Sequence, residues 1–518
     1  MSSSEDSTSQ STGDSIKDPS VQSPPGNSGS VTSHHCETKY IYVDFEPNDP
    51  RNPTNYSHRK KWIITSIACF FTLVAGITSA GYNMGFPSMI SDLATSRHQA
   101  MIGLSVFLLG FGVVPLVTAP FSEEFGRLPL YCVSLVGFLL MYVVIARAES
   151  ILAVQLGRFF QGAFGSTGAT MVGGTVADIW PHEQRGLPMA LFSLMAVGGN
   201  GLGPVIAGLI QYNDSLQWRW SQWIQMSVCA ACFLCIPLMG ETRSAIILIR
   251  IARKIRKDTG NPQYRAKIED ERTSLKHLIW TSCTRPLFLL ISEPIVTSFS
   301  VWIGLAWGIV YCMISSVGLV FTELHGFNVA QAGLGFLALV VGSLIGFGTN
   351  FIQEWLYRKY FPTKGVEARL YSACYAAILF PIGMFIYGAS CSPSVHWSGL
   401  VIGIMIFLWA TYTIYLAVFS YLADCYGPYA SSALAAQSLF RNILAAIFPL
   451  FSQQMYQTLT YRWANVLFGS LAVLMIPIPY VLLWYGPAIR NHSRFCKRVM
   501  DAHSKPEQSD LKTSKEKV

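Results

Sequence analysis

Long apolar runs, each near 20 residues, recur along most of the chain and are separated by shorter polar segments. A helix that crosses a bilayer needs about 20 predominantly apolar residues, so each run predicts one membrane span. The pattern indicates an all-α polytopic membrane protein with six spans, a longer polar loop and six further spans. The predicted spans are 62–82, 100–120, 128–147, 151–178, 187–211 and 220–240, then 291–321, 331–352, 370–390, 397–424, 431–455 and 463–485.

The polar stretches predict five regions. The chain begins with a segment rich in Ser, Thr, Gly and Pro that has no apolar periodicity, which is typical of disorder. The expected regions are a disordered tail over 1–60, a six-helix half over 61–240, a linker over 241–286, a second six-helix half over 287–486 and a basic tail over 487–518.

The linker has a pattern of its own. Ile247, Leu248, Ile251 and Ile255 recur at helical spacing, while arginines and lysines occupy the other faces. This indicates a basic amphipathic helix suited to an anionic bilayer surface, with a calmodulin-type target as the alternative.

Composition agrees with a membrane protein. Of the 518 residues, 51% are hydrophobic and 13% are charged, whereas soluble domains carry about 25% charged residues. The net charge of +8 comes from basic residues that gather in loops beside span ends. Cytosolic loops have this pattern, so we expect both termini in the cytosol and no nucleic-acid partner. The chain has no Gly-xxxx-Gly-Lys-Ser/Thr loop, which argues against an ATP-driven pump.

The twelve cysteines are scattered, and most fall within predicted spans. Cys229, Cys232 and Cys235 share one helix face, but no His or carboxylate accompanies them. Packing is therefore favoured over a metal site. We expect no metal, no cofactor and no disulfide framework.

The fifth predicted span contains the stretch Gly-Gly-Asn-Gly-Leu-Gly-Pro-Val-Ile-Ala-Gly over residues 198–208. Glycines let a second membrane helix come close, and a proline bends the span. Read from Gly199 through Gly203 and Pro204 to Gly208, the spacing resembles the antiporter motif of drug:proton antiporters in the major facilitator superfamily. A kinked packing helix without a role in ion coupling is the alternative.

Span eight repeats the four-residue spacing at Gly342 and Gly346. We expect Gly199 and Gly203 to pack against this face. Together with Pro204 and Gly208, the two pairs would then form the conformational seam between the halves.

The segment after span two, residues 119–129, resembles the superfamily's loop signature Gly-x-Leu-Ala-Asp-Arg-x-Gly-Arg-Arg. Gly126 and Arg127 are retained, and Glu123 stands where the signature has Asp. A turn with a charge pair at a helix seam would hold one conformation and release in another, so these residues are expected to form a loop latch. A plain surface turn is the alternative.

Span four contains Arg158, Gln161 and Gly162. They resemble the Arg-xx-Gln-Gly motif of the antiporters, whose arginine is associated with proton transfer. An arginine at this depth is costly unless it faces a polar cavity, so we expect Arg158 to face a central cavity, with a snorkelling arginine as the alternative. Acids are scarce, and Glu293, Asp178 and Asp424 are the candidate proton carriers, with Glu293 first. A helix cap or latch is the alternative for each.

Span eleven carries Gln437 and Arg441, one turn apart, which predicts a second arginine facing the cavity. Aromatic and amide side chains of other spans are expected to complete the lining. For each aromatic, helix packing or an interfacial belt is the alternative. The expected residues are Tyr82, Asn83, Trp302, Trp307, Tyr311, Tyr412 and Tyr415.

A weak internal repeat supports two homologous halves. Span four ends in Ala-Asp178, and span ten ends in Ala-Asp424. Parallel repeats of six spans are the known architecture of the superfamily.

Together these motifs resemble fungal twelve-span drug:proton antiporters over about residues 60–487. The resemblance implies a monomeric secondary active transporter of the plasma membrane, without enzymatic activity, that exports drugs, toxins, secondary metabolites or organic anions by proton antiport and alternating access. Its expected partners are a small-molecule substrate, protons and the lipid bilayer. The alternatives are an uptake carrier or a polyamine exporter of the same fold, followed by a membrane-embedded enzyme or a receptor.

The charges refine this expectation. Arg158 and Arg441 lie in the middle of spans, whereas no carboxylate occupies the middle third of any predicted span. Unpaired positive charges repel a polyamine and attract a carboxylate, and an aromatic lining suits a flat body. We therefore expect a neutral amphiphile or an organic anion as substrate.

Overall fold

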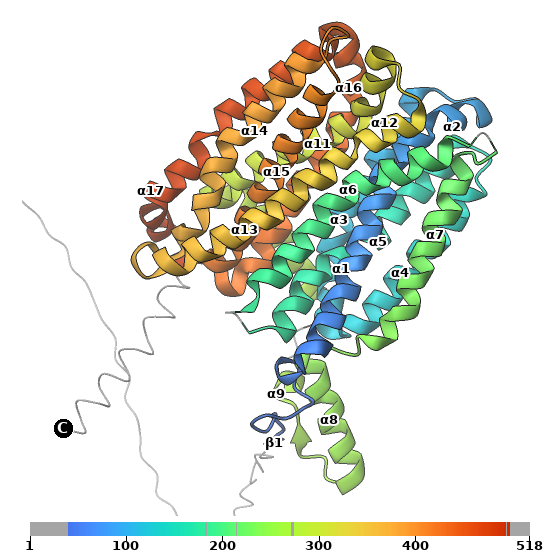
Figure 1. Ribbon diagram of the computed structural model, residues 1–518. Coiled ribbons are helices and arrows are strands. Elements are labelled where there is room, and N and C mark those ends of the chain that lie inside the picture. Colours follow the sequence, from blue (N-terminus) through green and yellow to red (C-terminus); the bar gives the residue numbers. More distant parts are fainter. Residues whose placement is uncertain (1–39, 182–183, 214, 271–273, 494, 498–518) are drawn as a thin grey trace, which may run out of the picture.

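The computed structural model describes residues 40–181, 184–213, 215–270, 274–493 and 495–497. Long helices run side by side through one bundle (Figure 1). In the first half they are α1 (His58–Gly81), α3 (Arg97–Glu124), α4 (Arg127–Ala146), α5 (Ile151–Ile179), α6 (Gly186–Gln211) and α7 (Trp218–Cys235). In the second half they are α11 (Pro294–His325), α13 (Leu337–Lys364), α14 (Tyr371–Ser390), α15 (Ser398–Tyr426), α16 (Ala430–Met475) and α17 (Pro477–His492).

Nine helical runs within the described residues are long and apolar enough to cross a membrane. Two of these runs, Val329–Ser390 and Ala430–His492, are 62 and 63 residues long. A 3-10 segment at Gly365–Leu370 interrupts the first, and Thr460, with φ of 63°, interrupts the second. Each long run therefore has length for two crossings, and the less apolar α5 adds another of 29 residues. The arrangement is consistent with twelve spans.

The helix ends follow local sequence signals. Ser96 and Gln99 form a capping box at the start of α3, and Ser150 caps α5. Gly126 ends the turn after α3 at φ of 99°, a backbone conformation that favours glycine. One predicted end was wrong, because α13 continues to Lys364. The division predicted between 431–455 and 463–485 agrees with the kink at Thr460 inside α16.

Short elements complete the chain. The helices α2 (Phe86–Asp92) and α12 (Val329–Gly335) lie beside long helices, and α10 (Leu275–Ser292) precedes α11. Outside the bundle are β1 (Ile41–Tyr42), α8 (Ser244–Thr259), β2 (Tyr264–Arg265) and α9 (Lys267–Asp270). Figure 1 shows α8, α9 and β1 beyond one end of the bundle, which we call the linker end.

The predicted helix of the linker exists as α8, and protein covers a face of it other than the predicted one. Ile246, Ile249 and Ala252 are buried against Ala266, with Val43 of the N-terminal segment packed on this cluster. Strand β1 pairs with β2 in parallel, with Ile41 opposite Tyr264. The predicted face, with Ile247, Ile251 and Ile255, is only partly buried, so the contact of this face with the bilayer stays a prediction.

Residues 40–60 are also ordered, so the prediction of a disordered tail is wrong for this part, and residues 1–39 lie outside the described residues.

An ion pair stabilises the folded unit around α8. Arg256 donates to both carboxylate oxygens of Glu269 at 2.9 and 3.0 Å. These hydrogen bonds hold the pKa of the Glu269 carboxyl below its usual value.

The glycines of α6 pack against α1. A Cβ on Gly199 would lie 2.9 Å from the Leu73 carbonyl oxygen, and a Cβ on Gly203 would lie 2.5 Å from that of Ile77. The predicted contact with Gly342 and Gly346 was wrong. Those two glycines face α15 instead, because they share a face of α13 that points into the second half.

Gly342 lies against the Met405 backbone, and Gly346 lies against the Tyr412 ring. Contact between the halves is made by other glycines of α6. A Cβ on Gly201 would lie 2.8 Å from the Val340 side chain, and one on Gly208 would lie 3.0 Å from the Gly333 Cα. One face of the glycine stretch therefore packs against α1, and another face packs against the second half.

This packing predicts different outcomes at two glycines of α6. Gly203→Ala would force a methyl group against a backbone carbonyl, and such overpacking costs about 1–3 kcal/mol. A methyl group on Gly198 would meet no atom of another helix within 4 Å, so Gly198→Ala is expected to be neutral or slightly stabilising. The thermal unfolding midpoint of the purified protein in detergent should fall for Gly203→Ala alone. Equal midpoints for both variants would contradict the packing.

Candidate functional site

A cavity of about 720 Å³ lies between the halves. Its lining comes from α1, α3, α5 and α6 on one side and from α11, α15 and α16 on the other. It extends from Trp307 and Tyr311 in the middle of α11 to Glu123, Arg127 and Asp424 at the linker end. This size suits a drug-sized molecule.

Polar contacts between the halves close the cavity at the end that lies away from the linker end. The Tyr311 hydroxyl lies 2.9 Å from the Ser79 hydroxyl and donates to the Asn200 side-chain oxygen at 3.3 Å. Farther from the linker end, Asn83 donates to the Ser315 hydroxyl at 3.3 Å. These bonds join α1, the turn after it and α6 to α11. The halves also meet nearer the linker end, where Gly186 lies against the Glu354 side chain.

The second half contributes a charged and aromatic wall. The Arg441 guanidinium lies 4.8 Å from the centroid of the Trp307 ring and 5.1 Å from that of Tyr415. Gln437 lines the cavity one turn before Arg441, as the sequence predicts. Cation–π contacts of this kind orient a guanidinium and shield its faces.

Arg158 does not line the cavity, so that prediction was wrong. Its side chain is fully buried behind the wall, between the rings of Tyr82 and Phe107, whose centroids lie 4.2 and 4.5 Å from the guanidinium carbon. The guanidinium donates to the Gln161 side-chain oxygen at 2.9 Å. It also donates to a carbonyl oxygen of α1, that of Thr78, at 3.2 Å. Protein groups thus supply part of the polar surroundings that a cavity was expected to supply, and the Arg158 Nε has no hydrogen-bond partner among the described residues.

Gly162 explains how α5 comes close enough for this arrangement. A Cβ at this position would overlap the Phe107 carbonyl oxygen of α3. The third residue of the Arg-xx-Gln-Gly motif therefore serves helix packing, while Arg158 and Gln161 form the polar pair.

The candidate acids are all engaged at helix ends. Asp178 accepts from the Arg127 Nε at 3.0 Å and lies 3.5 Å from Arg243. Glu293 is the N-terminal capping residue of α11, is 4% exposed and accepts a hydrogen bond from the Tyr426 hydroxyl at 3.1 Å. Neither carboxylate lines the cavity.

The loop predicted as a latch is held within the first half. The Glu241 carboxylate accepts from the Arg127 backbone N–H at 3.0 Å and lies against Gly126, where any Cβ would clash with it. Glu123 is exposed and lines the cavity near the linker end. The charge partner of Arg127 is therefore Asp178, a residue that the sequence pattern assigned to proton transfer.

The second half repeats this ion pair. Arg369 Nε donates to the Asp424 carboxylate at 3.0 Å, and its Nη1 donates to Glu354 at 2.8 Å. The Ala-Asp repeat at the ends of α5 and α15 thus marks equivalent positions. This agreement supports two homologous halves.

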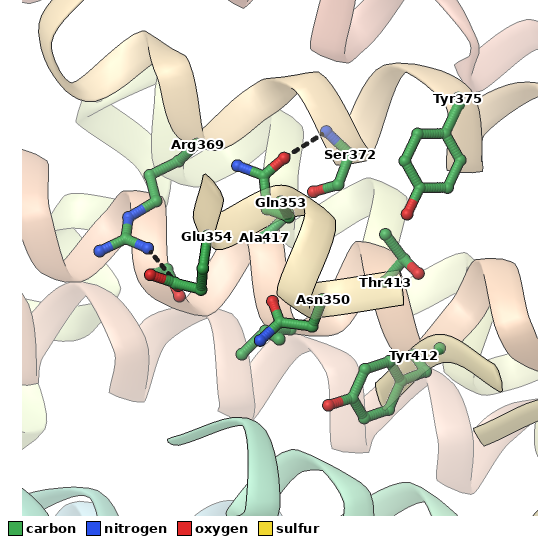
Figure 2. A pocket seen from close by; sticks show the side chains of 12 residues that line it. Asn350, Gln353, Glu354, Arg369, Ser372, Tyr375, Tyr412, Thr413 and Ala417 are labelled. Carbon is green, nitrogen blue, oxygen red and sulfur yellow. Dashed lines mark hydrogen bonds and ion pairs between the residues drawn. The ribbon is translucent and has the colours of Figure 1, made fainter. Parts of the chain in front are cut away.

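A separate pocket in the second half has a volume of about 10 Å³, which is room for about one water molecule. Figure 2 shows the side chains that line it. Gln353 accepts from the Ser372 backbone N–H at 2.9 Å, and the ion pair of Glu354 and Arg369 lies beside it. Tyr412 lines this pocket rather than the large cavity. Its hydroxyl donates to an α6 carbonyl oxygen at 3.0 Å, so it joins the halves.

Three other predicted lining residues do not reach the cavity. Tyr82 and Asn83 belong to the 3-10 turn after α1, and Trp302 is buried against Phe299. Of the expected lining residues, Trp307, Tyr311, Tyr415, Gln437 and Arg441 line the cavity.

Sequence reasoning missed two residues at the closed end of the cavity, Ser79 and Asn200. Asn200 lies inside the glycine stretch, where it is the single polar side chain. An amide in the middle of an apolar span was the signal that would have found it. Ser79 carried no comparable signal, because hydroxyls in membrane helices usually bond their own backbone.

Comparisons with known proteins agree with this architecture. The profile of the Major Facilitator Superfamily matches residues 68–427. The efflux pump radE of Floropilus chiversii is 34% identical over 463 residues, which cover 88% of this chain and 85% of the relative. The probable drug/proton antiporter YHK8 of Saccharomyces cerevisiae is 30% identical, over 86% of this chain and 88% of the relative. The multidrug transporter FLU1 of Candida albicans is 31% identical, over 88% and 76% respectively.

The ion pair of Arg127 and Asp178 predicts unequal effects at two carboxylates. Both its side chains are 11–12% exposed, so Asp178→Asn is expected to cost about 1–3 kcal/mol, because Arg127 loses a charged hydrogen-bond acceptor. Asp270→Asn removes a more exposed pair with Arg265, which is 27% and 38% exposed, and such pairs contribute about 0–1 kcal/mol. Thermal unfolding midpoints check the difference. A larger loss for Asp270→Asn would be inconsistent with it.

Proposed function

The chain belongs to the Major Facilitator Superfamily, and on that basis we propose that it is a secondary active transporter that exports small organic compounds by proton antiport. The observation that carries this proposal is the drug-sized cavity between two homologous halves, closed at one end by hydrogen bonds between them. Names of relatives, an efflux pump and a probable drug/proton antiporter, support export. No observation favours an enzyme or a receptor.

We further propose that the protein acts as a monomer in the plasma membrane with the linker end in the cytosol. Basic residues near this end, among them Arg127 and Arg185, support the orientation. The conformation with the cavity reaching the linker end is then the inward-facing one. Export requires the contacts of Tyr311, Asn83 and Gly208 to open while the halves close at the linker end.

The coupling proposal centres on Arg158. A guanidinium does not lose its proton in proteins, so Arg158 contributes a fixed charge and Gln161 orients it. Its bond to the Thr78 carbonyl oxygen connects it to α1, and Ser79 of α1 contacts Tyr311 across the halves. We propose that a carboxylate at a helix end, Asp178 or Glu293, exchanges the proton and that Arg158 transmits the resulting shift to the closed end.

This role predicts a severe defect in coupling. In proteoliposomes with an imposed pH gradient, Arg158→Ala should abolish substrate efflux, because α1 loses its charged anchor. Arg158→Lys should retain little, because an ammonium does not reproduce the planar hydrogen-bonding geometry. Arg462→Gln, at an exposed position of the opposite end, is the control and should transport normally. Full gradient-driven transport by Arg158→Ala would refute the proposal.

Alternating access predicts a reversible block. An added Cβ on Gly208 or on Gly333 would lie 3.0–3.1 Å from the other Cα, so the two positions are in contact and a disulfide between them needs only a small separation of the backbones. In a background without the native cysteines, Gly208→Cys with Gly333→Cys should crosslink, stop transport and recover on reduction. The pair Gly199→Cys with Gly342→Cys should not crosslink, because those positions face different helices. Undiminished transport by the fully crosslinked protein would contradict the proposed cycle.

A further inference from the structure

Two hydrogen-bond donors in the cavity wall have no acceptor. The Nε of Arg441 and the amide nitrogen of Gln437 are buried without a partner among the described residues. Both side chains line the cavity, and they are 8% and 2% exposed respectively. The remaining bond of the guanidinium is weak, a 3.4 Å contact with the Ser438 hydroxyl. Buried donors of this kind normally have partners.

The surroundings fix the guanidinium without neutralising it. Trp307 and Tyr415 lie against it, and their own ring centroids are 5.0 Å apart. Aromatic contacts restrain the plane of a guanidinium while leaving its N–H edge free for a carboxylate, which it binds through two parallel hydrogen bonds. The contacts therefore resemble a prepared anion receptor rather than a salt bridge.

Within the described lining of the cavity, no carboxylate lies near enough to fill this receptor. Among the described residues that line the cavity, the acids are Glu123 and Asp424. Asp424 follows Tyr415 by nine residues on α15, which is about 13 Å along a helix, and it is paired with Arg369. Glu123 is at the end of α3, about 16 Å along the helix from Gly112, which packs on Asn442 beside Arg441.

We infer that Arg441 and Gln437 bind an anionic oxygen of the substrate, a carboxylate or phenolate, while the indole of Trp307 and the ring of Tyr415 contact an attached flat apolar body. The inference rests on the proposed transport function and adds the class of substrate to it. It places a flat organic anion in the cavity and excludes polyamines, whose charges would meet a cation without a counter-ion.

Three naphthalene probes that differ only in charge test this inference. They are 1-naphthoate, 1-naphthamide and 1-naphthylmethylammonium, and their binding to the purified full-length protein in detergent is measured by calorimetry near pH 7.5. The naphthoate should bind most tightly. Arg441→Gln should weaken naphthoate binding about 10- to 100-fold, the range for hydrogen bonds to a charged group, and change naphthamide binding much less. Arg462→Gln is the matched control and should bind all three probes as the parent protein does.

Two further variants separate anion binding from packing. Arg441→Lys keeps the charge and should bind naphthoate with intermediate affinity, because one ammonium replaces two parallel donors. Gln437→Ala should reduce the preference for naphthoate over naphthamide by several-fold. If Arg441 merely supports the aromatic wall, the affinity for all three probes falls equally in Arg441→Gln and Arg441→Lys, and the inference is wrong. Tightest binding of the ammonium probe by the parent protein would also overturn it.

The binding assay needs no proton gradient, so it separates this inference from the transport proposal. Preference for naphthoate that depends on Arg441, in a protein that moves nothing in liposomes, would uphold the inference and refute proton antiport. Gradient-driven efflux of neutral compounds, together with equal binding of the three probes, would refute the inference alone.

Discussion

A guanidinium buried among apolar helices needs acceptors and rings on every side, and much of the first half is arranged around that requirement. Arg158 receives a side-chain acceptor from its own helix, carbonyl oxygens from α1 and ring faces from Tyr82 and Phe107. These groups come close enough only because small residues such as Gly162 let neighbouring helices approach each other closely. In lipid the hydrophobic effect does not drive helices together, because the lipid tails are as apolar as the side chains. Close packing and hydrogen bonds therefore decide which helices associate.

The two halves use the same ion pair at their linker ends but different charges in their middles. Arg127 with Asp178, and Arg369 with Asp424, are equivalent pairs at 3.0 Å. In the middle, the first half hides its arginine behind the cavity wall, whereas the second half places Arg441 in that wall. The repeat therefore gives both halves the same helix arrangement. The arginines differ, and we propose that the buried Arg158 acts in coupling and the lining Arg441 in substrate binding.

Much of the fold was predictable because the bilayer imposes a length on every apolar run. The order of helices, the six-linker-six pattern and the helix α8 all followed from this periodicity. The ordered segment over residues 40–60 did not follow, because its two-residue strand β1 is stabilised by Tyr264 and Arg265, more than 200 positions away in the chain. A disordered-looking composition says nothing about such a distant partner. The partner of α8 was missed for the same reason, since an amphipathic face indicates burial without naming what covers it.

The candidate site was predictable as a set of unusual residues but not as a geometry. Arg158 and Arg441 are both arginines in the middle of spans, and each has a Gln within one turn, so sequence treats them alike. What separates them is the rotation of each helix about its axis, which is set by contacts such as Gly162 on Phe107 and Gly112 on Asn442. A shift of one residue turns a helix by about 100°, enough to move a side chain from a cavity wall into a helix interface. The glycine stretch does mark a close helix contact, but its spacing indicates only how closely two helices approach. The spacing does not say which two helices they are.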